Sequence, residues 1–274
     1  MHGAWRCAIP WAAQRCTGSR HCRTTLRDCW SPCVSEFIVP DWPAPPGVCA
    51  LSTTRVGGVS RAPWAGFNLG DHVGDDPAAV GANRQRLRQA LPEEPRWLSQ
   101  VHGTRCVDAA ETSGGEQADA SFTRQRGAVC AVLTADCLPL IFCDDDATVV
   151  GAVHAGWRGL AAGVIESTVA AMGEPGERLM AWLGPAIGPR AFEVGNEVRE
   201  AFVATDAAAA MAFVAAPGGK WLCDIYLLAR QRLAALGIRR TSGADSCTVS
   251  EAGRFFSYRR DGVTGRMATL VWLE

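Results

Sequence analysis

The stretch that decides the fold runs from Val129 to Gly159 and reads VCAVLTADCLPLIFCDDDATVVGAVHAGWRG. Its apolar runs are short, rich in Val, Ile and Leu and separated by Asp-containing turns, so three strands are predicted. These strands are residues 129–134, 138–143 and 149–154. A helical pattern follows at once, with Leu160, Val164 and Met172 on one face. Strands in succession with few helices between them favour an α+β domain with a mixed sheet over a doubly wound parallel sheet.

The rest of the chain extends this pattern in both directions. Further strands are predicted at residues 48–53, 97–101, 179–183 and 267–272. One further helix is opened by Asp76 and Pro77 as N-cap and first-turn proline, and another lies between Asp224 and Gly237. Residues 184–189 contain two prolines, which lack the backbone donors of a phosphate loop, so they are predicted to form a rigid turn before a helix near Gly195.

The composition excludes several classes of protein. With 274 residues, 48% of them hydrophobic, the chain is not disordered. Its net charge of −1 gives no field that would gather nucleic acid or an anionic membrane. No run of about 18 apolar residues is present to span a bilayer, and arginines interrupt the amino-terminal segment where a signal peptide would be apolar. We therefore expect a cytoplasmic protein with no nucleic-acid or membrane partner.

The first 34 residues differ in composition from the remainder. They carry five of the twelve cysteines and five arginines but only one acidic residue, Asp28. One interpretation is a small zinc or redox appendage that uses these cysteines with His21. The cysteines form no C-x-x-C pair, which favours the other interpretation, an irregular extension. The predicted organisation is a Cys- and Arg-rich extension at residues 1–34 and one catalytic domain at residues 35–274.

Several common catalytic fingerprints are absent. The chain has no G-x-G-x-x-G after a strand, no G-x-x-x-x-G-K-[ST], no H-E-x-x-H and no G-x-S-x-G. The zinc deaminase signature, H-x-E with P-C-x-x-C, is missing as well. Dinucleotide binding, P-loop chemistry and the common hydrolase sites are thereby disfavoured.

Two histidines and one cysteine form the best candidate site. His102 and His154 lie beside glycines at predicted strand ends, and Cys137 lies at the break between two predicted strands. Two imidazoles and a thiolate suit zinc, and three protein ligands leave a fourth position open, as in catalytic sites. The spacings of 35 and 17 residues between these three side chains match no short metal motif. The alternative interpretation, a buried thiol with two structural histidines, therefore stays open. A further alternative is Cys137 as a nucleophile, with His154 or His102 as its base and Asp136 as an orienting carboxylate.

Polar groups in glycine-rich surroundings suggest a substrate contact. Ser52 and Arg55 lie in STTRVGGVS (52–60), which offers hydroxyls, a guanidinium and flexible backbone to a phosphate or carboxylate. Arg158 lies four residues after His154 and is a third candidate. The alternatives are a plain turn for the first segment and a surface or capping role for Arg158.

Several long motifs occur in a fixed order. They are STTRVGGVS (52–60), NLGDHVGD (68–75), QVHG (100–103), TADCLPL (134–140), VHAGWRGL (153–160), GPAIGPRAFEVG (184–195) and FFSYRRDGVTGRMA (255–268). Together they resemble the YfiH type of the laccase-domain family, whose members are variously named polyphenol oxidase, peptidoglycan editing factor and purine nucleoside phosphorylase. The resemblance covers Glu36 to Glu274. It implies a layered α/β sandwich with mixed β-sheets and zinc bound by His102, Cys137 and His154.

The resemblance also implies an activity on small molecules. It suggests phosphorolysis of adenosine, inosine and methylthioadenosine, with Ser52, Arg55 and Arg158 as candidates to bind phosphate, together with deamination of adenosine, which suits an open zinc site. Alternatives are a peptidoglycan-precursor editing hydrolase that uses the same zinc site and a copper-dependent polyphenol oxidase. A multicopper centre needs about ten histidines, largely in H-x-H pairs. This chain has five histidines and no such pair, which leaves copper only in the His-Cys-His site.

Overall fold

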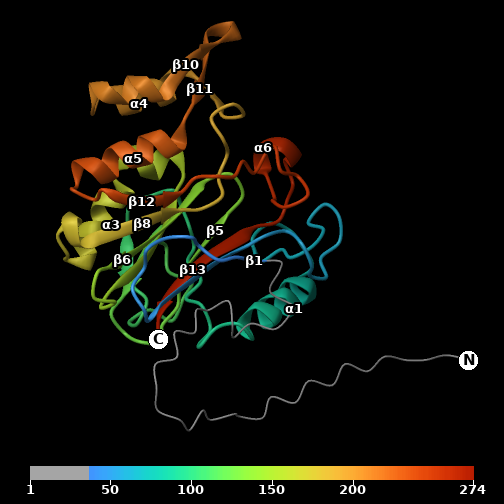
Figure 1. The fold of residues 1–274 in the computed structure, drawn as a ribbon. Helices are drawn as coiled ribbons and strands as arrows, with labels where there is room; N and C mark the ends of the chain where they lie inside the picture. The colour runs from blue at the N-terminus through green and yellow to red at the C-terminus, as the bar shows by residue number, and fades with distance from the viewer. Residues whose placement is uncertain (1–36) are drawn as a thin grey trace, which may run out of the picture. The chain divides into compact units, whose positions relative to one another are not determined.

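Three sheets and a layer of helices form the part of the chain that the computed structural model describes, residues 37–274 (Figure 1). These residues belong to one compact unit, Val34–Glu274. The extension predicted for residues 1–34 lies outside the described residues.

The largest sheet has six strands and mixed directions. Its order is β12(Arg240–Gly243), β8(Leu179–Leu183), β6(Leu138–Asp144), β7(Val150–Ala155), β4(Ala120–Thr123) and β3(Cys106–Asp108). The two edge strands pair in parallel with their neighbours, and all the other pairs are antiparallel. The sheet is therefore mixed, as predicted.

A four-stranded sheet packs on one face of the six-stranded sheet. Its order is β1(Phe37–Ile38), β2(Val48–Thr53), β13(Met267–Leu273) and β5(Cys130–Thr134), and β13 crosses the middle of the unit in Figure 1. Between the two sheets, Ile141 and Cys143 of β6 contact a core that includes Val132 and Val271. A small third sheet joins β10(Phe213–Ala216), β11(Lys220–Cys223) and β9(Glu193–Val194).

Helices cover the opposite face of the six-stranded sheet. Leu140 and Phe142 of β6 point to that side and join a core with Val164 and Leu228. Because β6 is buried on both faces, its sequence is a continuous apolar run rather than an alternating one. This arrangement of sheet, sheet and helices confirms the layered α/β sandwich.

The helices begin where the sequence places their caps. The Asp76 carboxylate accepts the Ala78 N–H at 2.9 Å and opens α1(Pro77–Arg88). Asp224 caps α5(Ile225–Ala235) in the same way by accepting the Leu227 N–H. The remaining helices are α2(Trp157–Ala162), α3(Val164–Met172), α4(Asn196–Val203) and α6(Tyr258–Asp261), with 3₁₀ turns at Gly176–Arg178, Ala207–Ala212 and Pro217–Gly219. The predicted helical face from Leu160 to Met172 is divided, because Gly163 has a φ of 99° and separates α2 from α3.

The strand predicted at residues 97–101 is wrong. The hydrogen bonds of this segment go to side chains and to an adjoining loop instead of a regular ladder. The Gln100 side-chain amide donates to the Leu133 carbonyl at 2.8 Å and accepts the Leu133 N–H at 2.7 Å. The Val101 N–H goes to the carboxylate of Asp119. The Gln100 side chain thus makes the hydrogen bonds at the edge of β5, and residues 97–101 form no backbone ladder there.

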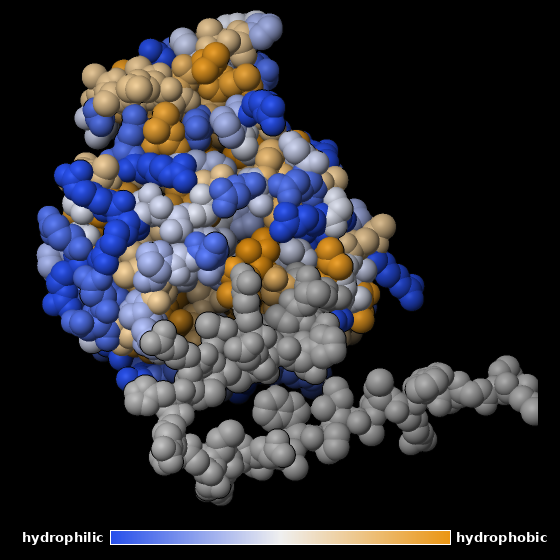
Figure 2. Space-filling model, viewed as in Figure 1, coloured by the Kyte–Doolittle hydropathy of each residue, from blue (hydrophilic) through white to orange (hydrophobic). Residues whose placement is uncertain are grey.

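The surface mixes polar and apolar residues. Figure 2 shows apolar residues gathered at the end formed by α4 and β10, where Met211 and Val214 are exposed. Within residues 37–274, no helix is long and apolar enough to cross a membrane.

Candidate metal centre

Three separate parts of the fold meet at one point. Cys137 lies where the chain passes from β5 in the four-stranded sheet to β6 in the six-stranded sheet. His154 is in the adjacent strand β7, opposite Pro139 of β6. His102 comes from the loop that precedes β3, where its φ is 61°. The structure therefore brings together the three residues selected from the sequence, although His102 lies in a loop and not at a strand end.

The ligand atoms of these residues are close to one another. Their imidazole nitrogens and sulfur all lie within 4.8 Å of one another. The Cys137 Sγ is 3.8 Å from His102 Nε2, and the two imidazole rings stand edge to face with centroids 4.8 Å apart. Across residues 37–274 this is the single group of three or more such side chains with metal-binding geometry.

Asp119 holds two of the three ligands in place. Its buried carboxylate lies 2.8 Å from His154 Nδ1, which leaves His154 Nε2 as the nitrogen for a metal. The same carboxylate accepts the backbone N–H groups of Val101, His102 and Gly103. The positive φ of His102 is thus fixed by hydrogen bonds on both sides of the residue. One carboxylate orients both histidines of the site.

The charges of the site are strongly coupled. Burial acts to raise the pKa of Cys137, but the charge of His154 and the hydrogen bonds from His102 and His154 outweigh it and lower the pKa to about 6. Burial likewise acts to lower the pKa of His154, while the charge of Cys137 and the hydrogen bond to Asp119 raise it to about 9. Without a metal, Cys137 and His154 therefore form a thiolate–imidazolium pair at neutral pH.

Two glycines allow the close approach of the ligands. A Cβ at Gly156 would lie 2.7 Å from His102 Cδ2 and 3.0 Å from Cys137 Sγ. A Cβ at Gly159 would lie 2.8 Å from the Gly103 carbonyl oxygen. The start of α2 can pack against the two ligands only because these positions have no side chain.

The donor set fits a metal ion. Tetrahedral zinc with bonds of about 2.0–2.3 Å places its ligand atoms about 3.3–3.6 Å apart, close to the distance between Cys137 and His102. His154 is buried, Cys137 is half-buried and His102 is exposed, so the site is closed at the back and open on the His102 side. A thiolate with two imidazoles also suits copper, and the donors by themselves do not decide between the two metals.

Asp136 has a different role from the one considered in the sequence analysis. As an orienting carboxylate it would contact a histidine, yet its oxygens accept the Thr248 hydroxyl at 2.6 Å and the Arg259 N–H at 2.7 Å. Its backbone carbonyl accepts the Ile187 N–H at 2.9 Å. Asp119, which the sequence analysis did not select, orients the histidines instead. The only sequence signal for Asp119 is an acidic residue directly before the apolar residues 120–122, which is a weak one.

The three predicted phosphate contacts lie in different surroundings. Ser52 is buried within β2, where its hydroxyl is 2.8 Å from the Thr269 hydroxyl. The Arg55 guanidinium stacks on Phe256. Arg158 is exposed and stacks on Trp157. A phosphate contact by Ser52 would require its buried hydroxyl to exchange partners, so this contact stays a prediction, as do those of Arg55 and Arg158.

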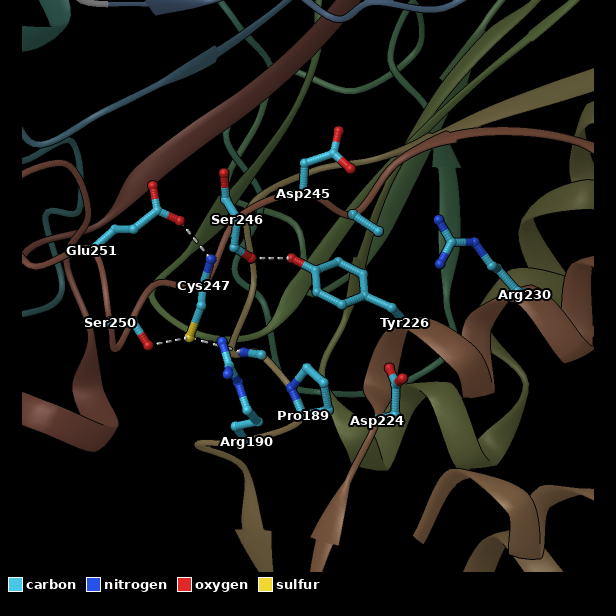
Figure 3. Close-up of a pocket in the computed structure, with 12 residues that line it drawn as sticks. Pro189, Arg190, Asp224, Tyr226, Arg230, Asp245, Ser246, Cys247, Ser250 and Glu251 are labelled. Carbon is cyan, nitrogen blue, oxygen red and sulfur yellow. Dashed lines mark hydrogen bonds between the residues drawn. The ribbon is translucent and has the colours of Figure 1, made fainter. Parts of the chain in front are cut away.

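A separate cavity of about 400 Å³ is lined by charged residues and one thiol (Figure 3). Cys247 Sγ accepts the Gly188 N–H at 3.2 Å and the Ser250 hydroxyl at 3.3 Å. The buried hydroxyl of Tyr226 accepts the Ala186 N–H at 2.8 Å. None of the three candidate metal ligands lines this cavity. Two N–H groups of the turn predicted at residues 184–189, those of Ala186 and Gly188, thus donate to Tyr226 and Cys247.

Comparisons with known proteins agree with this architecture. The chain is 56% identical over 243 residues to the purine nucleoside phosphorylase YfiH of Escherichia coli (strain K12), covering 88% of this chain and 100% of the relative. It is 55% identical over 242 residues to a purine nucleoside phosphorylase of Pseudomonas aeruginosa, with coverage of 88% and 100%. The crystal structure of Neisseria meningitidis protein NMB0706 superposes with a TM-score of 0.85 at 51% identity, over 87% of this chain and 99% of that one.

A family model covers most of the described residues. It is described as multi-copper polyphenol oxidoreductase laccase and matches residues 49–274. This span contains all three candidate metal ligands and Asp119. The chain belongs to this family, the YfiH-type laccase-domain proteins.

Proposed function

We propose that the protein is a zinc-dependent purine nucleoside phosphorylase that acts on adenosine, inosine and methylthioadenosine and also deaminates adenosine. The observation that carries this proposal is a metal-competent His-Cys-His set, open on one side, in a chain 56% identical to a purine nucleoside phosphorylase over that relative's whole length. Phosphorolysis converts adenosine and phosphate into adenine and ribose 1-phosphate, and deamination converts adenosine and water into inosine and ammonia.

Each residue of the site has a defined task in this proposal. A zinc ion held by His102, Cys137 and His154 would supply Lewis acidity at the open side of the site. Asp119 keeps His154 in the tautomer that presents Nε2, and it keeps the His102 loop in place. The exposed position of His102 lets a nucleoside approach from the solvent side.

The test compares activities in one preparation. Zinc-replete protein is incubated with adenosine, with and without phosphate, and products are followed by chromatography. We expect adenine and ribose 1-phosphate only with phosphate, and inosine without it. Cys137→Ala should abolish both reactions and keep the fold, whereas Cys223→Ala, which removes a buried thiol from the third sheet, should keep both activities.

Metal content is measured on protein purified without added metal. Elemental analysis should give one zinc per chain, and X-ray absorption should give one sulfur and about two imidazole ligands. A metal-free protein with full activity would contradict the zinc assignment and favour Cys137 as a nucleophile.

Two other outcomes would replace the proposal. Cleavage of a nucleotide-linked muramyl substrate, with nucleosides untouched, would identify a peptidoglycan-precursor editing hydrolase. Oxidation of phenols only after copper loading would identify a polyphenol oxidase, in keeping with the description of the family model.

A further inference from the structure

Arg266 lies at the sheet edge where the chain leaves β5 to form the metal centre. In the antiparallel pair of β13 and β5, Met267 is opposite Thr134. Arg266 comes directly before Met267, and Asp136 and Cys137 follow shortly after Thr134. Arg266 and Cys137 therefore lie beyond the same end of two paired strands.

The loop at residues 68–70 holds Arg266 in place. The Arg266 N–H donates to Asn68 Oδ1 at 2.8 Å, and the same oxygen accepts the Gly70 N–H at 2.9 Å. A Cβ at Gly70 would lie 2.7 Å from Arg266 Cγ. The aliphatic part of the Arg266 side chain therefore packs directly against Gly70, and residue 70 has no room for a side chain of its own.

The guanidinium of Arg266 has unused donors. Its Nη1 donates to the carbonyls of Thr264 and Gly265, at 3.1 and 3.0 Å. Within the described range 37–274, Nε and Nη2 have no acceptor, and no carboxylate lies at ion-pair distance. A half-buried arginine keeps its charge, and its planar fork is suited to bidentate binding of a phosphate.

The register of β13 and β5 places Arg266 at the same sheet edge as the metal centre, and the charges around it are consistent with that position. Burial acts to lower the pKa of Arg266, and the negative charges of Cys137 and Asp136 act to raise it. The Asp136 carboxylate is already occupied by Thr248 and Arg259. The free side of the guanidinium is thus available to an external anion.

We propose that Arg266 binds the phosphate of the phosphorolysis beside the metal centre, with Nε and Nη2 donating to two phosphate oxygens. This inference rests on the proposed function and adds a phosphate-binding residue that was not among the sequence candidates. The bound phosphate oxygen forms a bond to C1′ of the ribose while the bond from C1′ to N9 breaks. The base leaves with that electron pair and takes up the proton of hydrogen phosphate.

The test separates phosphate binding from the rest of the site. In Arg266→Met the KM for phosphate should rise roughly 10-fold or more, because two charge-assisted hydrogen bonds are lost. Deamination of adenosine needs no phosphate, so its rate should fall much less than the rate of phosphorolysis. Calorimetric titration of the zinc-loaded protein with inorganic phosphate should lose its binding heat in Arg266→Met and recover part of it in Arg266→Lys.

Two further variants sharpen the test. Arg178→Met removes an arginine that pairs with Asp146 and contacts neither the 68–70 loop nor the metal ligands, and it should leave the phosphate KM unchanged. Gly70→Ala keeps the charge of Arg266 but displaces its stem, so the phosphate KM should rise while deamination continues. If Arg266→Met fails to fold, the phosphate KM of Gly70→Ala tests the role of Arg266 instead.

The outcomes distinguish this inference from the proposed function. Phosphorolysis with an unchanged phosphate KM in Arg266→Met would overturn the role of Arg266 and leave the function standing. Phosphate binding that depends on Arg266 in a protein without phosphorolysis would support the anion site and overturn the function. A lower melting temperature with unchanged phosphate binding would assign Arg266 a structural role only and overturn the inference.

Discussion

Asp119 shows how much of the site depends on one residue outside the candidate ligand set. Its carboxylate contacts His154 Nδ1 and three consecutive backbone N–H groups, and its own carbonyl accepts the His154 N–H at 2.7 Å. A carboxylate can accept all of these bonds, whereas an amide would turn one NH₂ group toward N–H donors. The geometry of both histidines therefore requires an ionised acid at this position.

Asp119→Asn should weaken metal binding by roughly 10- to 100-fold, the usual cost of losing an outer-shell partner of a metal ligand. The affinity is measured by competition with a chromophoric chelator. The matched control is Asp144→Asn, which removes an equally buried carboxylate that accepts the N–H groups of Thr148 and Val149 away from the site. Equal losses of metal affinity in both variants would show that Asp119 acts only through general stability.

The titration of His154 predicts how metal binding depends on pH. Metal binding needs a neutral imidazole, whereas the raised pKa of His154, about 9, keeps it protonated at neutral pH in the metal-free protein. Affinity should therefore increase by about 10-fold per pH unit between pH 7 and 9 and level off above that range. Calorimetry at pH 7.5 in two buffers of different ionisation enthalpy should detect about one proton released per metal bound. An affinity independent of pH across this range would contradict the thiolate–imidazolium pair.

At the scale of elements, apolar runs were predictable and polar strands were not. The strands β2 and β8 coincide with the predicted residues, because continuous apolar runs bounded by turns belong to strands buried on both faces. The strand β12 consists of Arg240, Thr241, Ser242 and Gly243 and carries no such signal. It is a strand because β8 offers a free edge for parallel pairing. Residues 97–101 are the converse case: their sequence predicts a strand, but the side chains of Gln100 and Asp119 make hydrogen bonds where a backbone ladder would be.

The start of α2 supports a prediction about the closeness of the ligands. Gly156 has ordinary backbone angles, φ −63° and ψ 155°, so alanine there introduces only the steric effect of its Cβ. Gly156→Ala should reduce metal affinity more than Asp119→Asn does, because the Cβ overlaps both His102 and Cys137. Overpacking should also cost about 1–3 kcal/mol of unfolding free energy.

The control for Gly156→Ala is Gly253→Ala, where nothing lies within 4 Å of the added Cβ. Metal affinity is compared in a chelator competition, and stability in urea unfolding. Unchanged metal affinity in Gly156→Ala would show that the ligands are further apart in solution than in the structure.

For the whole molecule, the site depends on topology that spacing does not reveal. His102, Cys137 and His154 belong to a loop, a crossing between sheets and a strand, so their separations of 35 and 17 residues follow from the length of the intervening elements. The donor types of these three side chains suggested a metal site, and the motifs in their fixed order identified the three residues as one ligand set. Arg266 could not be selected in that way, because its significance comes from Asn68, 198 residues earlier in the chain.

The division of the chain at about residue 34 leads to the last prediction. The Escherichia coli relative is matched over 100% of its length by 88% of this chain, and the sheets and helices described here all lie within Phe37–Leu273. A core of this size can fold without further segments. Deleting residues 1–34 should therefore leave the melting temperature and the zinc content nearly unchanged, as measured by calorimetry and elemental analysis on the full chain and the truncated chain in parallel. Loss of solubility together with loss of metal would show that the Cys-rich segment belongs to the folded enzyme, and it would favour the zinc or redox appendage over an irregular extension.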